Sequence, residues 1–259
     1  IQSIAGIAML NERVLGEPRY LPTIVADKTT AITVVYGVLA ALFSRERTGH
    51  GQELEVPMFE TMVSYVMAEH LWGMTFDPPL GPPGYVRLMS VHRRPHRTRD
   101  GYVAILPYMN AHWDTFCDVT GHPELKDDPR FRTMGDRTRN IDDTYAETAR
   151  IMATRNTQEW LDLFASTSVP INRVNTLADL ADDPHLLETG FWKTVEHPTE
   201  GRLRTTAFPV NFSATPADET RRHAPRLGEH TREVLDELGY AQERIESMLA
   251  SGAAAGARD

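Results

Sequence analysis

The sequence predicts a mixed α/β protein that is rich in helix and carries a separate middle segment. Two observations predict this class. Long segments with apolar residues at helical spacing are joined by short runs typical of strands. In addition, residues 77–84 form a proline- and glycine-rich linker, and about 100 residues follow it, an ordinary size for a small domain. We therefore expect three segments, residues 1–80, 81–190 and 191–259.

The first long helix is predicted to start near Asp27 and to end before Gly49. Pro22 disfavours helix just before it, and glycine favours the end of a helix. Apolar residues surround this helix on nearly every side, which indicates a helix that is buried on most faces. They are Ile32, Val35, Tyr36, Leu39, Leu42 and Phe43.

The same periodicity predicts further helices at residues 58–74, 112–119, 143–155, 157–166, 177–181, 231–238 and 242–249. Thr157 is expected to cap the helix that begins there. Strands are predicted at residues 52–56, 102–106 and 169–174, and a hairpin joins residues 191–196 to 203–207. Residues 125–140 are expected to form a polar surface connection, and residues 251–259 a disordered tail.

The composition is ordinary for a soluble globular chain, with 41% hydrophobic and 24% charged residues. Lysine and arginine number 27 against 36 aspartates and glutamates, so the formal net charge is −9. This charge argues against a protein that binds nucleic acid through bulk electrostatics. The single cysteine, Cys117, excludes an internal disulfide and a multi-cysteine zinc site, and it is typical of the reducing cytoplasm, where we expect this protein.

The N-terminus has no basic segment of the kind that begins a signal peptide. The longest apolar run, residues 31–43, is shorter than a bilayer requires, so we expect no membrane partner. The chain opens on Ile1 without an initiator methionine, and its first residues are typical of the inside of an element. We therefore expect a piece of a longer polypeptide.

Asp27 stands where an extended, proline-containing segment meets the long helix. Aspartate is among the preferred N-cap residues, where its side chain accepts a hydrogen bond from a backbone N–H two or three positions on. A helix N-terminus also keeps a carboxylate ionised, which is the state in which it can attack a carbonyl carbon. The local sequence leaves both roles open.

A basic run at residues 87–99 holds five arginines and two histidines in a chain that is otherwise acidic. One interpretation is a solvated surface with salt bridges. The other is an anion site, because arginine binds carboxylates and phosphates in bidentate geometry. On the second interpretation Arg93 and Arg94 are candidate substrate-binding residues.

The common catalytic motifs are absent. We find no Gly-x-Ser-x-Gly elbow, no phosphate-binding loop ending in Gly-Lys-Ser/Thr, no His-Glu-x-x-His and no dinucleotide fingerprint. His92 and His96 are four residues apart, but Pro95 prevents a helix between them and no third ligand follows at useful spacing. We expect no metal site.

Several short motifs remain, in a fixed order along the chain. They are Ala26-Asp27 with the helix after it, residues 39–52, Asp100-Gly101-Tyr102, Asp128-Pro129-Arg130-Phe131, Val169-Pro170, Glu196-His197-Pro198 and residues 224–231. Each motif alone is weak, but the ordered set is specific and covers nearly the whole chain. It resembles the class III CoA-transferases, the family that includes formyl-CoA transferase and carnitine CoA-transferase.

The resemblance implies a large nucleotide-binding-type α/β domain, partly missing here, a small α/β domain, and two subunits that interlock as a homodimer. It also implies a mechanism, in which Asp27 attacks an acyl-CoA thioester to form a mixed anhydride. CoA then forms an aspartyl-CoA thioester, and an acceptor carboxylate takes the CoA. Coenzyme A is thus a substrate, the partners are an acyl-CoA and a carboxylic acid, and no metal takes part.

Members of this family are longer, so the resemblance identifies the chain as the C-terminal portion of a longer member. A separate chain that carries the N-terminal half is a second candidate partner. Some transferases also have a glycine-rich loop in the small domain, whereas residues 84–94 contain no glycine run.

Two alternatives stay open. A racemase of the same family needs an acid/base pair, and the glutamate of that pair would fall near Asn110. Asparagine cannot take a proton, which favours a transferase and leaves Asn110 as a candidate substrate-binding residue. A non-catalytic CoA-binding subunit is the second alternative.

Overall fold

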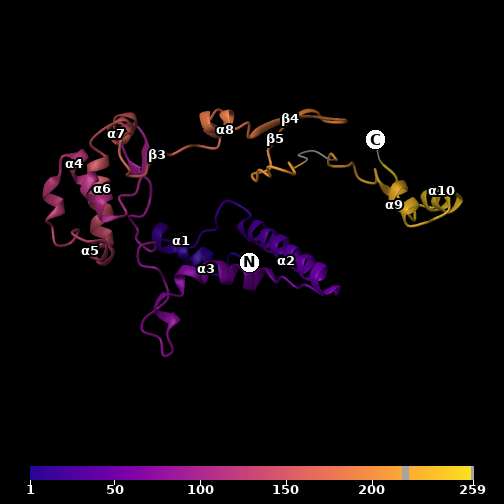
Figure 1. Cartoon of the computed structure of the whole chain (residues 1–259), viewed down its shortest axis with the longest axis horizontal. Coiled ribbons are helices and arrows are strands. Elements are labelled where there is room, and N and C mark those ends of the chain that lie inside the picture. Colours follow the sequence, from indigo (N-terminus) through magenta and orange to yellow (C-terminus); the bar gives the residue numbers. More distant parts are fainter. Residues whose placement is uncertain (218–221, 258–259) are drawn as a thin grey trace. The chain divides into compact units, whose positions relative to one another are not determined.

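The computed structural model describes residues 1–217 and 222–257 and shows a mixed α/β chain, as the sequence predicts (Figure 1). The chain divides into two compact units, Ile1–Val174 and Asn175–Asp259. The first unit contains two separate hydrophobic cores, one within residues 5–66 and one within residues 103–169. The division into three segments at residues 80 and 190 stays a prediction.

The first core lies among helices α1 (Ile7–Leu15), α2 (Val25–Thr48) and α3 (Met58–His70), and the short helix η1 (Trp72–Thr75) follows. Ala26 near the start of α2 packs with Met62 and Val66 of α3. Helix α2 ends at Gly49, which adopts a φ of 76° and donates its N–H to the Arg45 carbonyl. The strand predicted at residues 52–56 is wrong, because this extended segment pairs with no strand of the described residues.

Helix α2 differs from the sequence prediction in its burial. Only Ala26 and Thr30 of its 24 residues are buried. Ile32 is 68% exposed and Phe43 is 64% exposed. The prediction of a helix buried on most faces is therefore wrong for the described chain, because α3 and the N-terminal segment cover only the first turns of α2.

By length and composition, α2 is also apolar enough to cross a membrane. The sequence-based argument counted only the apolar run at residues 31–43, whereas the helix extends well beyond that run at both ends. A core helix of a soluble protein has the same length and composition. The helix therefore gives no membrane assignment, and the expected absence of a membrane partner stays a prediction.

The second core lies under a three-stranded antiparallel sheet in the order β1 (His96–Arg97), β2 (Tyr102–Ile105) and β3 (Ile171–Arg173). Val103 pairs with His96 on one side and with Arg173 on the other. The helices of this region are α4 (Asn110–Thr120), η2 (Pro123–Lys126), α5 (Met134–Arg139), α6 (Ile141–Met152) and α7 (Thr157–Phe164). Large aromatic side chains, led by Trp113, Phe116 and Trp160, fill the core.

Two local expectations need correction here. Asn156, rather than Thr157, caps α7, in a capping box with Glu159. Instead, the Thr157 N–H donates to Asp100 at 2.7 Å, which ties the β1–β2 turn to the start of α7. Residues 125–140 are more than a surface connection, because they include the end of η2, the whole of α5 and the buried side chain of Arg137.

The second unit contains η3 (Asp179–Ala181), α8 (Pro184–Glu188), the strands β4 (Trp192–His197) and β5 (Gly201–Thr206), and helices α9 (Thr231–Glu237) and α10 (Gln242–Ala250). The predicted hairpin is confirmed, with Val195 opposite Leu203. Asp183 caps α8 by accepting the Leu186 N–H. The tail expected to be disordered forms a turn and a bend at residues 251–254, residues 255–257 have no regular secondary structure, and the last two residues lie outside the described residues.

Candidate active site

Asp27 lies in the first turn of α2, as its third residue. Ile24 occupies the N-cap position and makes no side-chain cap hydrogen bond, so the N-cap role considered for Asp27 is wrong. The Asp27 side chain is exposed, and within the described residues its carboxylate accepts no hydrogen bond. Both carboxylate oxygens are therefore available to a ligand.

Asp27 lines an open pocket of about 370 Å³. The residues around it come from the N-terminal segment, the loop before α2 and the start of α3, namely Gln2, Ser3, Tyr20, Thr23 and Met58, among others. This volume lies within the range of small-molecule sites. The pocket thus combines a free carboxylate with space for part of a substrate.

Hydrogen bonds fix the walls of this pocket. Gln2 accepts the Leu21 N–H at 2.9 Å through Oε1 and donates to the carbonyls of Leu21 and Thr23 through Nε2. The Ser3 hydroxyl lies 2.8 Å from the Tyr20 hydroxyl. These bonds join the N-terminal segment to the loop before α2, and they hold that loop against the pocket.

The electrostatic environment of Asp27 favours an anion. The first N–H groups of a helix have no acceptor inside the helix, and the helix dipole is positive at this end. Within the described residues, the backbone N–H groups of Ala26 and Asp27 donate to no carbonyl. Lys28 adds a positive charge beside them, held by its hydrogen bond to the Thr23 hydroxyl at 3.1 Å. The burial of Ala26 in the core keeps this turn in place.

The other predicted site residues do not line the Asp27 pocket. Asn110 is the first residue of α4, and its Oδ1 accepts hydrogen bonds from the Met134 N–H at 2.8 Å and from Arg137 Nη2 at 2.9 Å. The carbonyl of this amide thus joins α4 to α5. A role for Asn110 in substrate binding stays a prediction.

Arg93 and Arg94 line a different pocket, of about 380 Å³, beside the three-stranded sheet. Arg93 donates to the Tyr145 hydroxyl at 3.0 Å. The arginines of the basic run do not share one role. Arg87 is buried, donates to the Thr138 hydroxyl and lies over the Tyr108 ring at 4.8 Å. Arg87 therefore stabilises the fold, whereas Arg93 and Arg94 remain candidates for binding.

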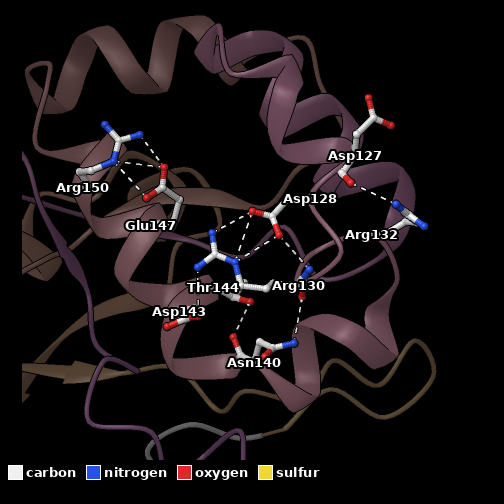
Figure 2. Close-up of polar contacts among 9 residues, drawn as sticks. All are labelled: Asp127, Asp128, Arg130, Arg132, Asn140, Asp143, Thr144, Glu147 and Arg150. Atoms are coloured by element: carbon white, nitrogen blue, oxygen red, sulfur yellow. Dashed lines mark hydrogen bonds and ion pairs between the residues drawn. The ribbon is translucent and has the colours of Figure 1, made fainter.

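The motif Asp128-Pro129-Arg130-Phe131 forms a structural ion-pair cluster (Figure 2). Asp128 accepts the Arg130 N–H at 2.9 Å and its Nη2 at 2.8 Å, and Asp143 on α6 accepts from Nη1 at 3.1 Å. These contacts hold the Arg130 guanidinium against its neighbours. The motif thus links the loop after η2 to α6 and presents no free group for catalysis.

Other reactive groups are few. Among residues 1–217 and 222–257 no cluster of three histidine, cysteine, aspartate or glutamate side chains could hold a metal ion. Burial raises the pKa of the Cys117 thiol to about 12, which keeps it protonated and unreactive at neutral pH.

Sequence reasoning missed the residues that form the pocket around Asp27. Gln2 and Tyr20 belong to no motif, and only the fold brings them beside α2. It also missed His96 and Tyr145, which line the second pocket with Arg93 and Arg94. The histidine was considered as a metal ligand and as part of the basic run, but nothing in the spacing of residues 96 and 145 indicates their proximity.

Comparison with known proteins relates the chain to one family. The family model described as CoA-transferase family III matches residues 1–231. Succinyl-CoA:mesaconate CoA-transferase from Haloarcula hispanica is 29% identical over 252 residues, which cover 95% of this chain and 62% of that protein. Succinyl-CoA:glutarate CoA-transferase from Mus musculus is 28% identical, with 92% of this chain and 54% of that protein covered. Formyl-CoA:oxalate CoA-transferase from Escherichia coli is 26% identical, with 90% and 61% covered.

Solved structures show the same fold. A crystal structure of Rv3272 from Mycobacterium tuberculosis matches with a TM-score of 0.66 at 23% identity, over 83% of this chain and 57% of that chain. A CAIB/BAIF family protein from Brucella suis matches with a TM-score of 0.67 at 24% identity, over 92% and 61%. The chain thus spans only 54–62% of the curated relatives named above.

Proposed function

Because the chain belongs to CoA-transferase family III, we propose that it supplies the nucleophile of an acyl-CoA:carboxylate CoA-transferase, and that this nucleophile is Asp27. The observation that carries the proposal is the unpaired Asp27 carboxylate on an open pocket at the N-terminus of α2. The curated relatives are named as CoA-transferases, which supports the same reaction class.

In the first step, an Asp27 oxygen attacks the thioester carbonyl carbon of the acyl-CoA, and the C–S bond breaks. The products are an aspartyl mixed anhydride and the CoA thiolate. Negative charge develops on the carbonyl oxygen during the attack, and donors fixed in advance lower the barrier. The unbonded N–H groups of Ala26 and Asp27 are suitable donors.

In the following steps, the CoA thiolate attacks the Asp27 carbonyl carbon and releases the first acid as a carboxylate. This leaves an aspartyl-CoA thioester. The acceptor carboxylate then attacks the same carbon and releases the thiolate, and the thiolate attacks the acyl carbon of the acceptor. Asp27 leaves as a carboxylate, so the cycle needs no oxidant, no metal and no net proton.

A mixed anhydride hydrolyses readily, so the working site must exclude water. The pocket around Asp27 is open, and the apolar surface of α2 beyond Thr30 is exposed. We propose that further polypeptide covers both, either from a longer chain of the length of the relatives or from a second subunit. This exposed surface is compatible with an interlocked homodimer and also with a separate chain that carries the N-terminal half. The proposed location remains the reducing cytoplasm.

Chemical trapping tests the nucleophile. We expect the protein, incubated with succinyl-CoA and hydroxylamine, to form a hydroxamate at Asp27, which mass spectrometry of the peptide locates. The Asp27→Asn variant should form none and lose turnover by a factor of about 10³ or more, as expected for loss of a nucleophile. Asp77→Asn, which removes another carboxylate from the N-terminal region, is the matched control and should still be trapped.

Trapping at another carboxylate, or unchanged turnover in Asp27→Asn, would show that the nucleophile is misassigned. CoA binding without any hydroxamate would favour the non-catalytic subunit. Exchange of the proton next to the thioester carbonyl, without acyl transfer, would favour the racemase.

A further inference from the structure

The second pocket of the first unit has the form of a small-molecule site. Its volume of about 380 Å³ is that of a site for a small organic compound. Its walls are mostly apolar and include Ile105, Leu106 and Pro170, and Arg93 and Arg94 add two guanidinium groups. It shares no lining residue with the pocket of Asp27.

The two arginines lack the partners that cations on an acidic protein usually find. Within the described residues no carboxylate forms a salt bridge with Arg93 or Arg94, although the chain has a net charge of −9. The hydrogen bond to the Tyr145 hydroxyl orients the Arg93 guanidinium. An oriented and unpaired guanidinium at an apolar pocket favours an anion with an apolar body, because arginine binds carboxylates with directed, charge-assisted hydrogen bonds.

His96 adds a neutral imidazole to the wall of the same pocket. It lines the same pocket and is only 5% exposed, yet its Nδ1 is buried without a hydrogen-bond partner among the described residues. Burial, with the nearby Arg94 cation, lowers the pKa of His96 to about 4, so this side chain is a neutral hydrogen-bonding group at pH 7.

We propose that this pocket binds a carboxylic acid with a compact apolar body, with the carboxylate at Arg93 and Arg94 and the body against Ile105, Leu106 and Pro170. If the acid is a substrate of CoA transfer, this pocket is a binding site for it that is separate from the pocket of Asp27. This role as a substrate site rests on the proposed function. The binding itself does not depend on it.

Calorimetric titration of the purified protein with benzoate tests the proposal directly. We expect saturable binding at one site, and binding of the neutral benzamide that is weaker by roughly tenfold, since the charge-assisted bonds are lost. Inorganic phosphate, an anion without an apolar body, should also bind more weakly than benzoate.

Variants assign the binding to this pocket. Arg93→Gln and Arg94→Gln should each weaken benzoate binding by roughly five- to tenfold. Arg99→Gln removes the same charge from the same basic run but lines no part of this pocket, and it should bind as the unaltered protein does. Ala104→Phe places an aromatic ring in the pocket at an exposed strand position and should abolish binding with both arginines intact.

Equal affinity for benzoate and benzamide, equal affinity for phosphate, or equal weakening by Arg99→Gln would each overturn the proposal. Thermal unfolding of every variant excludes a loss of binding through misfolding. The outcome is separable from the test of Asp27. If a hydroxamate forms at Asp27 but benzoate does not bind, only the proposal for the second pocket is overturned. If benzoate binds but no hydroxamate forms, only the proposed transferase mechanism is overturned.

Discussion

At the scale of the residue, the position of Asp27 within its helix decides what its carboxylate can do. An aspartate at the N-cap uses a carboxylate oxygen to accept backbone N–H groups. Asp27 lies three positions later, and Ile24, which holds the N-cap, has no side-chain acceptor. Within the described residues, the N–H groups of Ala26 and Asp27 and the Asp27 carboxylate therefore all lack a hydrogen-bond partner, on the same pocket. On the proposed mechanism, one turn of helix thus supplies both the nucleophile and the donors for the oxyanion.

His96 makes a testable contribution to the pH dependence of stability. Burial, and then the charge of Arg94, lower its pKa from 6.5 to about 4. The unfolded chain therefore binds the proton more readily between these two values, so stability should be greatest above pH 6.5 and fall as the pH decreases toward 4. The expected loss across this interval is up to about 3 kcal/mol.

Urea unfolding at a series of pH values measures this loss. The other charged groups that line the pockets around His96 are arginines, at positions 87, 93, 94, 97 and 137, and no carboxylate lines them. His96→Gln removes the titrating ring, so the free energy of unfolding of this variant should fall less steeply between pH 6.5 and pH 4. Identical pH profiles for the two proteins would show that the imidazole does not titrate as described.

At the scale of the element, Arg137 joins α4 and α5. It is only 2% exposed, donates to the Phe131 and Tyr108 carbonyls and to Asn110 Oδ1, and lies over the Trp113 ring at 5.4 Å. Arg137→Ala would remove the donor from the Phe131 and Tyr108 carbonyls and open a cavity. We expect destabilisation by about 3 kcal/mol or more, measured by urea unfolding.

Arg130→Ala is the matched control for this change. Arg130 makes ion pairs with Asp128 and Asp143, but about half of its side chain is exposed, so solvent screens them. We expect a much smaller loss of stability than for Arg137→Ala. Equal losses would mean that the surface cluster of Figure 2, and not the buried arginine, holds this region together.

Elements with strong periodic patterns could be predicted from the sequence, and those set by tertiary contacts could not. The apolar spacing in α3, α6 and α7 is sufficient to predict these helices, and the turn that precedes β5 is sufficient to predict the hairpin. Helix α5 has no apolar stripe, because its buried residue is Arg137, and it was missed. The site divides in the same way. The resemblance predicts Asp27 as the nucleophile, and this stays a prediction, but only the fold shows that His96 and Tyr145 line one pocket with Arg93.

At the scale of the whole molecule, the most prominent feature of the described chain is the apolar surface of α2 that it leaves exposed. Helix α2 exposes Ile32, Val35, Tyr36, Leu39 and Phe43, and monomeric proteins rarely expose apolar patches of this kind. The chain spans 54–62% of its curated relatives, so the relatives contain polypeptide that has no counterpart here. The sequence shows that this helix is apolar on nearly every side, so we expect further polypeptide to pack against it.

The exposed surface of α2 predicts the behaviour of the 259-residue chain alone. We expect it to bind the dye ANS and to self-associate in sedimentation velocity, because apolar surface is removed from water on association. Leu39→Glu with Phe43→Glu should reduce both effects and leave the unfolding of the second core unchanged, since neither residue belongs to that core. Leu163→Glu, an exposed apolar residue on α7, is the control and should have little effect on association. A monomeric chain that binds no dye would contradict the prediction. If instead the chain floats with phosphatidylcholine vesicles and Leu39→Glu abolishes this flotation, α2 binds a bilayer.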